Sequence, residues 1–219
     1  MEKLADKGNG NYAYIDSFSE ARKVLVEEIG STLVTIAKDV KIQVEFNPSR
    51  VGAYRLIGYE NRQLAAQDFN DDKKDAGEIG AGHTVTALYE IVPPGKEGSL
   101  PTVDPLKYQT PSTPSRDVAS NELMTLKLRY KQPNGEKSEL LQFPVIDSGA
   151  TLDVSSKDFR FAASVAAFGM ILRDSPYRGD FTLRQVETLA EANLGPDKGG
   201  YRREFLSLVR NAASLRREK

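Results

Sequence analysis

The 219-residue sequence contains no cysteine and a single histidine, His83. The lack of cysteine excludes disulfide bonds, thiolate zinc sites and a cysteine nucleophile. With one histidine present, a Ser-His-Asp triad would have to use His83. The sequence also lacks Gly-x-Ser-x-Gly, the turn that presents the serine in α/β-hydrolases, so a structural or surface histidine is the favoured interpretation.

Positive charge is not in excess, because 30 basic residues face 31 acidic ones and the net charge is −1. Such a chain has no overall positive field to attract a phosphate backbone, and we expect no nucleic-acid partner. A local basic cluster lies near the C-terminus, where positive charge suits the end of a helix. It comprises Arg202, Arg203, Arg210, Arg216 and Arg217.

Long apolar runs are missing as well, so we expect no membrane span. The polar segment Met1–Asn11 does not resemble a signal peptide. We therefore expect either a cytoplasmic protein or a fragment whose targeting segment lies upstream.

The N-terminal part predicts one strand and one helix. Asn11–Asp16 is rich in aromatic and β-branched residues, as strands are. Ser17 and Glu20 have the spacing of a capping box, and Gly30 is a plausible helix end. The expected inward face of this helix comprises Ala21, Val24, Leu25 and Ile29.

Residues 36–150 predict an antiparallel β-sandwich. In Val40–Phe46 apolar residues alternate with Lys, Gln and Glu, which predicts that Val40, Ile42, Val44 and Phe46 share a buried face. Asn134-Gly135 predicts a tight hairpin. Further strands are expected at 54–59, 84–91, 124–130 and 140–145. The proline-rich segment 93–120 is expected to be disordered or draped over the surface, with a binding loop as the minority alternative.

Residues 151–219 predict a small helical subdomain, so the fold class is α+β. Phe159–Leu172 is apolar nearly all round and predicts a buried central helix. A second helix is expected from Thr182, with Val186, Leu189 and Ala190 inward, and a third over 200–217. Its expected buried residues are Tyr201, Phe205, Leu208, Val209 and Ala212.

Several stretches resemble the C-terminal part of bacterial von Willebrand factor A-domain proteins of the YfbK type. They are Gly8–Asp16, Val51–Arg62, Asp75–Val85, Phe159–Ala162 and Arg173–Tyr177. The resemblance covers nearly the whole chain outside the proline-rich segment. It implies that residues 1–35 are the last strand and helix of an A domain, and that the rest is a domain of unknown function.

The resemblance also implies where a metal would lie. A domains of this type bind a divalent cation through Asp-x-Ser-x-Ser together with a Thr and an Asp on separate loops. That motif is absent, and in Asp153–Lys157 a lysine replaces the second serine. We therefore expect no cofactor in this chain, and a divalent metal only in the A-domain portion outside it.

Two loops carry the alternative site predictions. In the acidic run Asp68–Asp75, the residues Asp68, Asn70 and Asp72 alternate as in a calcium loop. The match then fails, because Lys73 occupies the glycine position and Ile79 the position of the bidentate glutamate. Glu78 and His83 mark a second candidate functional loop. Tyr54, Tyr59 and Tyr89 could form a binding face, although packing is the commoner role of strand tyrosines.

The function predicted from the sequence is a non-catalytic interaction or scaffold region that supports binding by an A domain. A protein partner is expected, including the chain's own upstream A domain. We also expect the exposed strand 12–16 to pair with a second copy, to swap, or to add to the sandwich. By resemblance, a cell-envelope or periplasmic location is expected. The alternatives are a hydrolase using His83 and a calcium-assisted carbohydrate- or peptide-binding sandwich.

Overall fold

A computed structural model describes residues 1, 4–5, 8, 12–59, 63–96 and 121–216. The chain divides into two compact units. The first contains residues 1–53, 60–85 and 91–146, and the second contains 54–59, 86–90 and 147–219. Most of the proline-rich segment, residues 97–120, and Arg217 lie outside the described residues.

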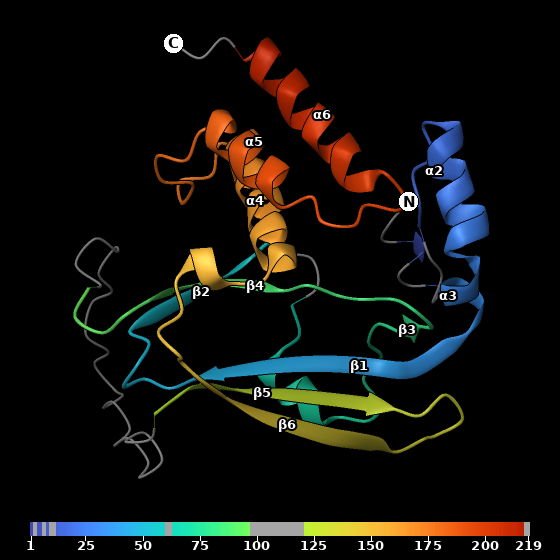
Figure 1. The fold of residues 1–219 in the computed structure, drawn as a ribbon. Helices are drawn as coiled ribbons and strands as arrows, with labels where there is room; N and C mark the ends of the chain where they lie inside the picture. The colour runs from blue at the N-terminus through green and yellow to red at the C-terminus, as the bar shows by residue number, and fades with distance from the viewer. Residues whose placement is uncertain (2–3, 6–7, 9–11, 60–62, 97–120, 217–219) are drawn as a thin grey trace. The chain divides into compact units, whose positions relative to one another are not determined.

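The first unit is built on one four-stranded antiparallel sheet, in the order β3-β1-β5-β6 (Figure 1). The strands are β1 (Thr35–Phe46), β3 (Ile79–Gly80), β5 (Glu122–Lys131) and β6 (Ser138–Ile146). The predicted hairpin is confirmed, because β5 and β6 pair from Lys131 with Ser138 to Met124 with Val145, with a register shift between Met124 and Glu122. Its connection is longer than the expected tight turn: it spans residues 132–137, and the Gly135 amide donates to the Gln132 carbonyl within it.

The α+β class is confirmed, but the β-sandwich is not. The remaining strands, β2 (Ala53–Ile57) and β4 (Leu88–Val92), form a separate two-stranded ribbon. Residues 84–87, predicted as the start of a strand, are not in the ladder.

The two faces of the large sheet differ in chemistry. Register aligns Ile42, Leu128 and Leu141 in one row across β1, β5 and β6, and Val44, Leu126 and Phe143 in the next row of that face, so one face is apolar. The prediction that this face of β1 is buried was wrong: Ile42 is 47% exposed, whereas Lys41 on the opposite face is 3% exposed. Alternation identifies two faces but does not determine which of them the chain covers.

The predicted N-terminal strand is also wrong, because residues 12–16 are exposed and lie outside any ladder. A strand needs a hydrogen-bonded neighbour, and the described part of this chain does not supply one. Pairing with a second copy stays a prediction.

The predicted helix begins as expected, since Ser17 Oγ accepts a hydrogen bond from the Glu20 amide at 3.1 Å. It then runs through α2 (Phe18–Arg22), a π-helical turn (Lys23–Glu27) and α3 (Ile29–Leu33), past the predicted stop at Gly30. A π-turn inserts an extra residue and rotates the side chains that follow. Leu25 and Ile29, expected to face inward, are instead 60% and 45% exposed.

The second unit contains the β2/β4 ribbon and three helices, α4 (Lys157–Leu172), α5 (Leu183–Ala192) and α6 (Tyr201–Leu215). The predicted start of α5 is confirmed, because Thr182 and Gln185 form a capping box. The core comprises Ala167, Ile171, Leu183, Val186 and Val209. In α4, however, Phe159, Val165 and Leu172 are exposed, so this helix is covered on one side only. Leu208, predicted to be buried, is 55% exposed.

The ribbon is joined to the end of α4 through Arg55 on β2. Its guanidinium pairs with Glu90 on β4 at 2.5 Å, stacks 4.3 Å from the ring centroid of Tyr177, and approaches Met170 Sδ at 3.3 Å. Within the part of the chain that the structure describes, no helix is long and apolar enough to cross a membrane.

Candidate functional site

A network of polar contacts lies where the acidic run covers the polar face of the sheet in the first unit. A short 3-10 helix, η3 (Ala66–Asn70), begins this segment and buries Phe69. Two lysines from neighbouring strands, Lys41 on β1 and Lys131 on β5, are 3% and 9% exposed beneath it. Buried ammonium groups must be hydrogen-bonded, so their partners define the site.

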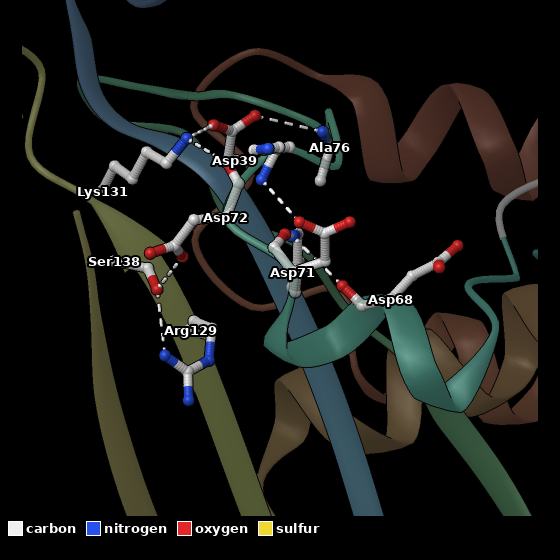
Figure 2. A network of polar contacts seen from close by, with 10 residues as sticks. Asp39, Asp68, Asp71, Asp72, Ala76, Arg129, Lys131 and Ser138 are labelled. Atoms are coloured by element: carbon white, nitrogen blue, oxygen red, sulfur yellow. Dashed lines mark hydrogen bonds and ion pairs between the residues drawn. The ribbon is translucent and has the colours of Figure 1, made fainter. Parts of the chain in front are cut away.

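Each lysine binds backbone carbonyls of the acidic segment. Lys41 Nζ donates to the carbonyl of Asp68 at 3.2 Å and to that of Asp71. Lys131 Nζ donates to the carbonyl of Asp72 at 2.7 Å and forms an ion pair with Asp39 at 2.7 Å. The two side chains therefore hold the segment on the sheet. Figure 2 shows Lys131 beside Asp39 and Asp72.

Asp39 on β1 binds the chain just after the acidic segment, at Ala76. It has a left-handed backbone (φ 50°) where the register of β1 on β5 is irregular, and its Oδ1 accepts a hydrogen bond from the Ala76 amide at 3.1 Å. Burial alone raises the pKa of Asp39, but hydrogen bonds from Lys131 and Ala76 outweigh it and hold the pKa below its ordinary value. Asp39 is therefore an anion at neutral pH.

A second set of hydrogen bonds joins the acidic segment to β5 and β6. Ser138 Oγ donates to Asp72, Arg129 donates to Ser138 Oγ at 2.9 Å, and Arg129 also donates to Asn70 at 3.1 Å (Figure 2). The hydrogen bond from Ser138 lowers the pKa of Asp72. Arg129 lies 5.6 Å from the ring centroid of Phe69, so the same side chain covers the buried aromatic.

These contacts bear directly on the calcium-loop candidates. The carboxylate of Asp68 pairs with Lys74 at 3.3 Å, while Asn70 and Asp72 accept from Arg129 and Ser138. The oxygens that a calcium ion would need thus face protein donors instead. Among the described residues, no group of three or more acidic or histidine side chains is placed to hold a metal.

The second candidate loop, with Glu78 and His83, lies beside β3. Glu78 accepts a hydrogen bond from Thr35 Oγ1 at 3.2 Å. His83 is exposed, and its ring has no hydrogen-bond partner in the described part of the chain. The structure therefore does not bring His83 together with the serine and carboxylate that the hydrolase alternative requires.

The tyrosine candidates lie in the second unit. Tyr54 on β2 is 58% exposed, and Tyr89 on β4 is half-buried, with a pKa that burial raises. Tyr59 donates from its hydroxyl to the Thr86 carbonyl at 3.0 Å. Tyr59 is thus engaged in holding its own loop.

The basic C-terminal cluster is matched by acids rather than presented as one positive surface. Arg202 pairs with Asp158 at 2.5 Å, Arg210 pairs with Glu187 and Glu191, and Arg216 pairs with Asp174. The backbone amide of Arg203 donates to Asp197 at 3.0 Å. These pairs bind α6 to α4 and α5.

An N-terminal helical segment of the first unit also exposes apolar side chains. We call them the helical stripe: Phe18, Leu25, Val26, Ile29 and Leu33, with exposed fractions of 87%, 60%, 64%, 45% and 74%. Leu25, Ile29 and Leu33 are four residues apart, but the π-helical turn at Lys23–Glu27 changes the helical period, so the five residues are grouped as exposed side chains of one helical segment. Exposed apolar side chains gathered on one segment are typical of an interaction site. The helical spacing of Leu25 and Ile29 predicts an inward face for both residues, and that prediction was wrong.

The stripe is fixed to the sheet through α3 and β3. The Ala81 amide donates to the Val34 carbonyl at 2.8 Å. A Cβ on Gly80 would lie only 1.5 Å from the Ser31 carbonyl oxygen, so glycine alone permits this approach. The C-terminal end of the stripe is therefore fixed to the edge of the sheet.

Comparison with known proteins places this α+β chain in a family. The family model described as "Uncharacterized protein YfbK, C-terminal" matches residues 31–215, and the chain belongs to that family. The uncharacterized protein YfbK of Escherichia coli (strain K12) is 46% identical over 209 residues, which cover 95% of this chain and 35% of the relative. The chain thus spans about a third of that relative's length. No solved structure matches it.

Proposed function

We propose that this chain is a non-catalytic interaction and scaffold region of a longer YfbK-like protein, and that its helical stripe packs against the region that precedes it. By the resemblance of the sequence, that preceding region is a von Willebrand factor A domain. The scaffold would hold the A domain and support its binding of a ligand or protein, in the cell envelope.

One observation carries the proposal: the stripe lies immediately ahead of, and just within, the family match that begins at residue 31. Because the family is described as the C-terminal part of its protein, the remaining length of the relative largely precedes the match. In this proposal the stripe lies next to the boundary between the matched region and the region that precedes it.

The energetics favour an intramolecular contact. Burying an apolar side chain of this size stabilises by about 1.5–3 kcal/mol, so the five residues, scaled by their exposed fractions, supply roughly 5–10 kcal/mol before the cost of association. A covalent link between the two regions removes much of that cost.

The test uses a full-length chimera in which this chain replaces the matched part of the Escherichia coli protein. Hydroxyl-radical footprinting compares the reactivity of Phe18 and Leu33 in the isolated chain and in the chimera. We expect both to become protected in the chimera, while Leu215 on α6, 85% exposed, reacts equally in both. Unchanged reactivity of Phe18 would contradict the proposal.

Substitutions give a second readout. Phe18→Ser and Leu33→Ser should lower the melting temperature of the chimera but not that of the isolated chain, because the side chains are covered only in the longer protein. Leu215→Ser is the matched control and should lower neither. Equal effects of the three substitutions in the chimera would show that the stripe is not the junction.

A further inference from the structure

A groove in the second unit has features of a binding site that the proposed function does not use. It has a volume of about 620 Å³ and lies along α5, beside η6 (Leu152–Val154) and the start of α4. This volume is within the usual range of about 300–1,000 Å³ for ligand sites. Its apolar lining comprises Leu152, Phe181, Leu189 and Ala192.

The groove is held open by a preformed set of hydrogen bonds. Arg160 donates from Nη1 to the carbonyls of Asp153 at 2.6 Å and Ser155 at 2.7 Å, and from Nε to Asn193 at 2.7 Å. Asn193 is 4% exposed and donates to the Leu189 carbonyl at 2.7 Å. These bonds fix η6 against the end of α5, so little ordering is required when a ligand binds.

The polar lining carries unmatched positive charge. The exposed guanidinium of Arg184 makes no hydrogen bond or ion pair with the described residues, and Nη2 of Arg160 is also unused. Asp153 is the one carboxylate in the lining. Two guanidinium groups beside one carboxylate leave a net positive groove with an apolar floor, which suits an anion attached to an apolar group.

The groove's length indicates what kind of molecule carries that anion. Its lining follows α5 from Phe181, just before the helix, to Ala192 at its end. The ten residues of α5 rise about 15 Å, the length of an extended segment of about five residues. A small carboxylate would occupy only a fraction of it.

We propose that this groove binds a short acidic peptide segment. An apolar side chain of the segment packs on Phe181 and Leu152, and the carboxylate of a neighbouring Glu or Asp is bound by Arg184 with Arg160. The partner is therefore a protein that exposes an acidic residue next to a large apolar one.

The test titrates the ¹⁵N-labelled chain with three capped pentapeptides: Ala-Glu-Leu-Ala-Ala, Ala-Gln-Leu-Ala-Ala and Ala-Glu-Ala-Ala-Ala. We expect the Glu-Leu peptide to shift amide resonances of α5 and η6 with a high-micromolar to millimolar Kd. The Gln-Leu and Glu-Ala peptides should each bind at least about fivefold more weakly, because one lacks the charge and the other the apolar contact.

Variants of the chain identify the residues. Arg184→Gln should weaken binding of the Glu-Leu peptide at least about fivefold and remove the preference for the Glu-Leu peptide over the Gln-Leu peptide. Lys198→Gln removes an exposed positive charge from the same unit outside the groove and should change neither.

Three results would overturn the proposal. One is equal binding of the Glu-Leu and Gln-Leu peptides, or no shift with either. A second is an Arg184→Gln variant that binds the Glu-Leu peptide as tightly as the Lys198→Gln variant does. The third is sodium acetate saturating the same resonances as tightly as the Glu-Leu peptide, which would indicate a simple anion site.

Discussion

Replacing Gly80 by alanine should detach the N-terminal helical segment from the sheet. The added Cβ would lie 1.5 Å from the Ser31 carbonyl oxygen and 2.5 Å from its carbon, whereas ordinary contacts begin near 3.4 Å. Both are backbone atoms, so no side-chain rotation can relieve the overlap. Either α3 moves away from β3, or β3 leaves the edge of the sheet.

The expected loss of stability follows from these two outcomes. Overpacking costs about 1–3 kcal/mol, and loss of the hydrogen bond from the Ala81 amide to the Val34 carbonyl adds about 1 kcal/mol. We therefore expect the free energy of unfolding to fall by roughly 2–4 kcal/mol.

Equilibrium urea denaturation measures the loss, and hydrogen exchange at the Ala81 amide locates it. Gly77→Ala, just before β3, is the matched control, because a Cβ there meets no atom within 4 Å and the backbone is not left-handed. If the free energies of unfolding of the Gly80→Ala and Gly77→Ala variants agreed within about 0.5 kcal/mol, the reasoning about this close approach would be refuted.

Further predictions concern the acidic segment and its neighbours. Lys41→Met should lower the free energy of unfolding by roughly 2 kcal/mol, since the carbonyls of Asp68 and Asp71 lose the charged donor that holds them on the sheet; Lys38→Met, at a less buried position on the same strand, is the control for urea denaturation. Because the folded-state pKa of Asp39 lies below its unfolded value, its stabilising contribution is complete above about pH 4 and is lost as the pH falls through the folded value. Asp39→Asn should therefore be less stable at neutral pH, with a shallower loss of stability below about pH 4; an unchanged acid limb in thermal melts at several pH values would count against the ion pair. Calorimetric titration with millimolar calcium should show no saturable heat, because Asp68, Asn70 and Asp72 already face Lys74, Arg129 and Ser138; a stoichiometric binding curve would reverse that conclusion. His83→Ala should change the free energy of unfolding by less than about 0.5 kcal/mol, since its ring contacts no hydrogen-bonding group in the described chain; a larger loss would indicate a structural role.

Sequence analysis succeeded where a short pattern determines a local structure. The Asn134-Gly135 turn predicts the β5/β6 hairpin, and Ser17 and Thr182 predict helix starts, because each depends on residues close in the chain. These signals are nearly independent of what packs around them.

It failed where the outcome depends on distant segments. Alternation in β1 indicated an apolar face to bury, but Lys41 is the buried residue because the segment around Asp71, about 30 residues away, supplies carbonyls for its ammonium group. The π-turn at Lys23–Glu27, which carries Leu25 to the surface, has no recognised sequence signal. The groove along α5 depends on Arg160 and Asn193, which lie 33 positions apart, and could not be predicted from either.

The two lysines beneath the acidic segment hold it in place without a metal ion from solution. In calcium-binding loops the organising cation is exchangeable, so chelators and fluctuating ion levels can release it. Here the cations are Lys41 and Lys131, which belong to the chain and cannot be removed by a chelator. Both amines are almost inaccessible, so an amine-reactive reagent should label them only when the segment lifts, and their labelling rate would measure how often it opens.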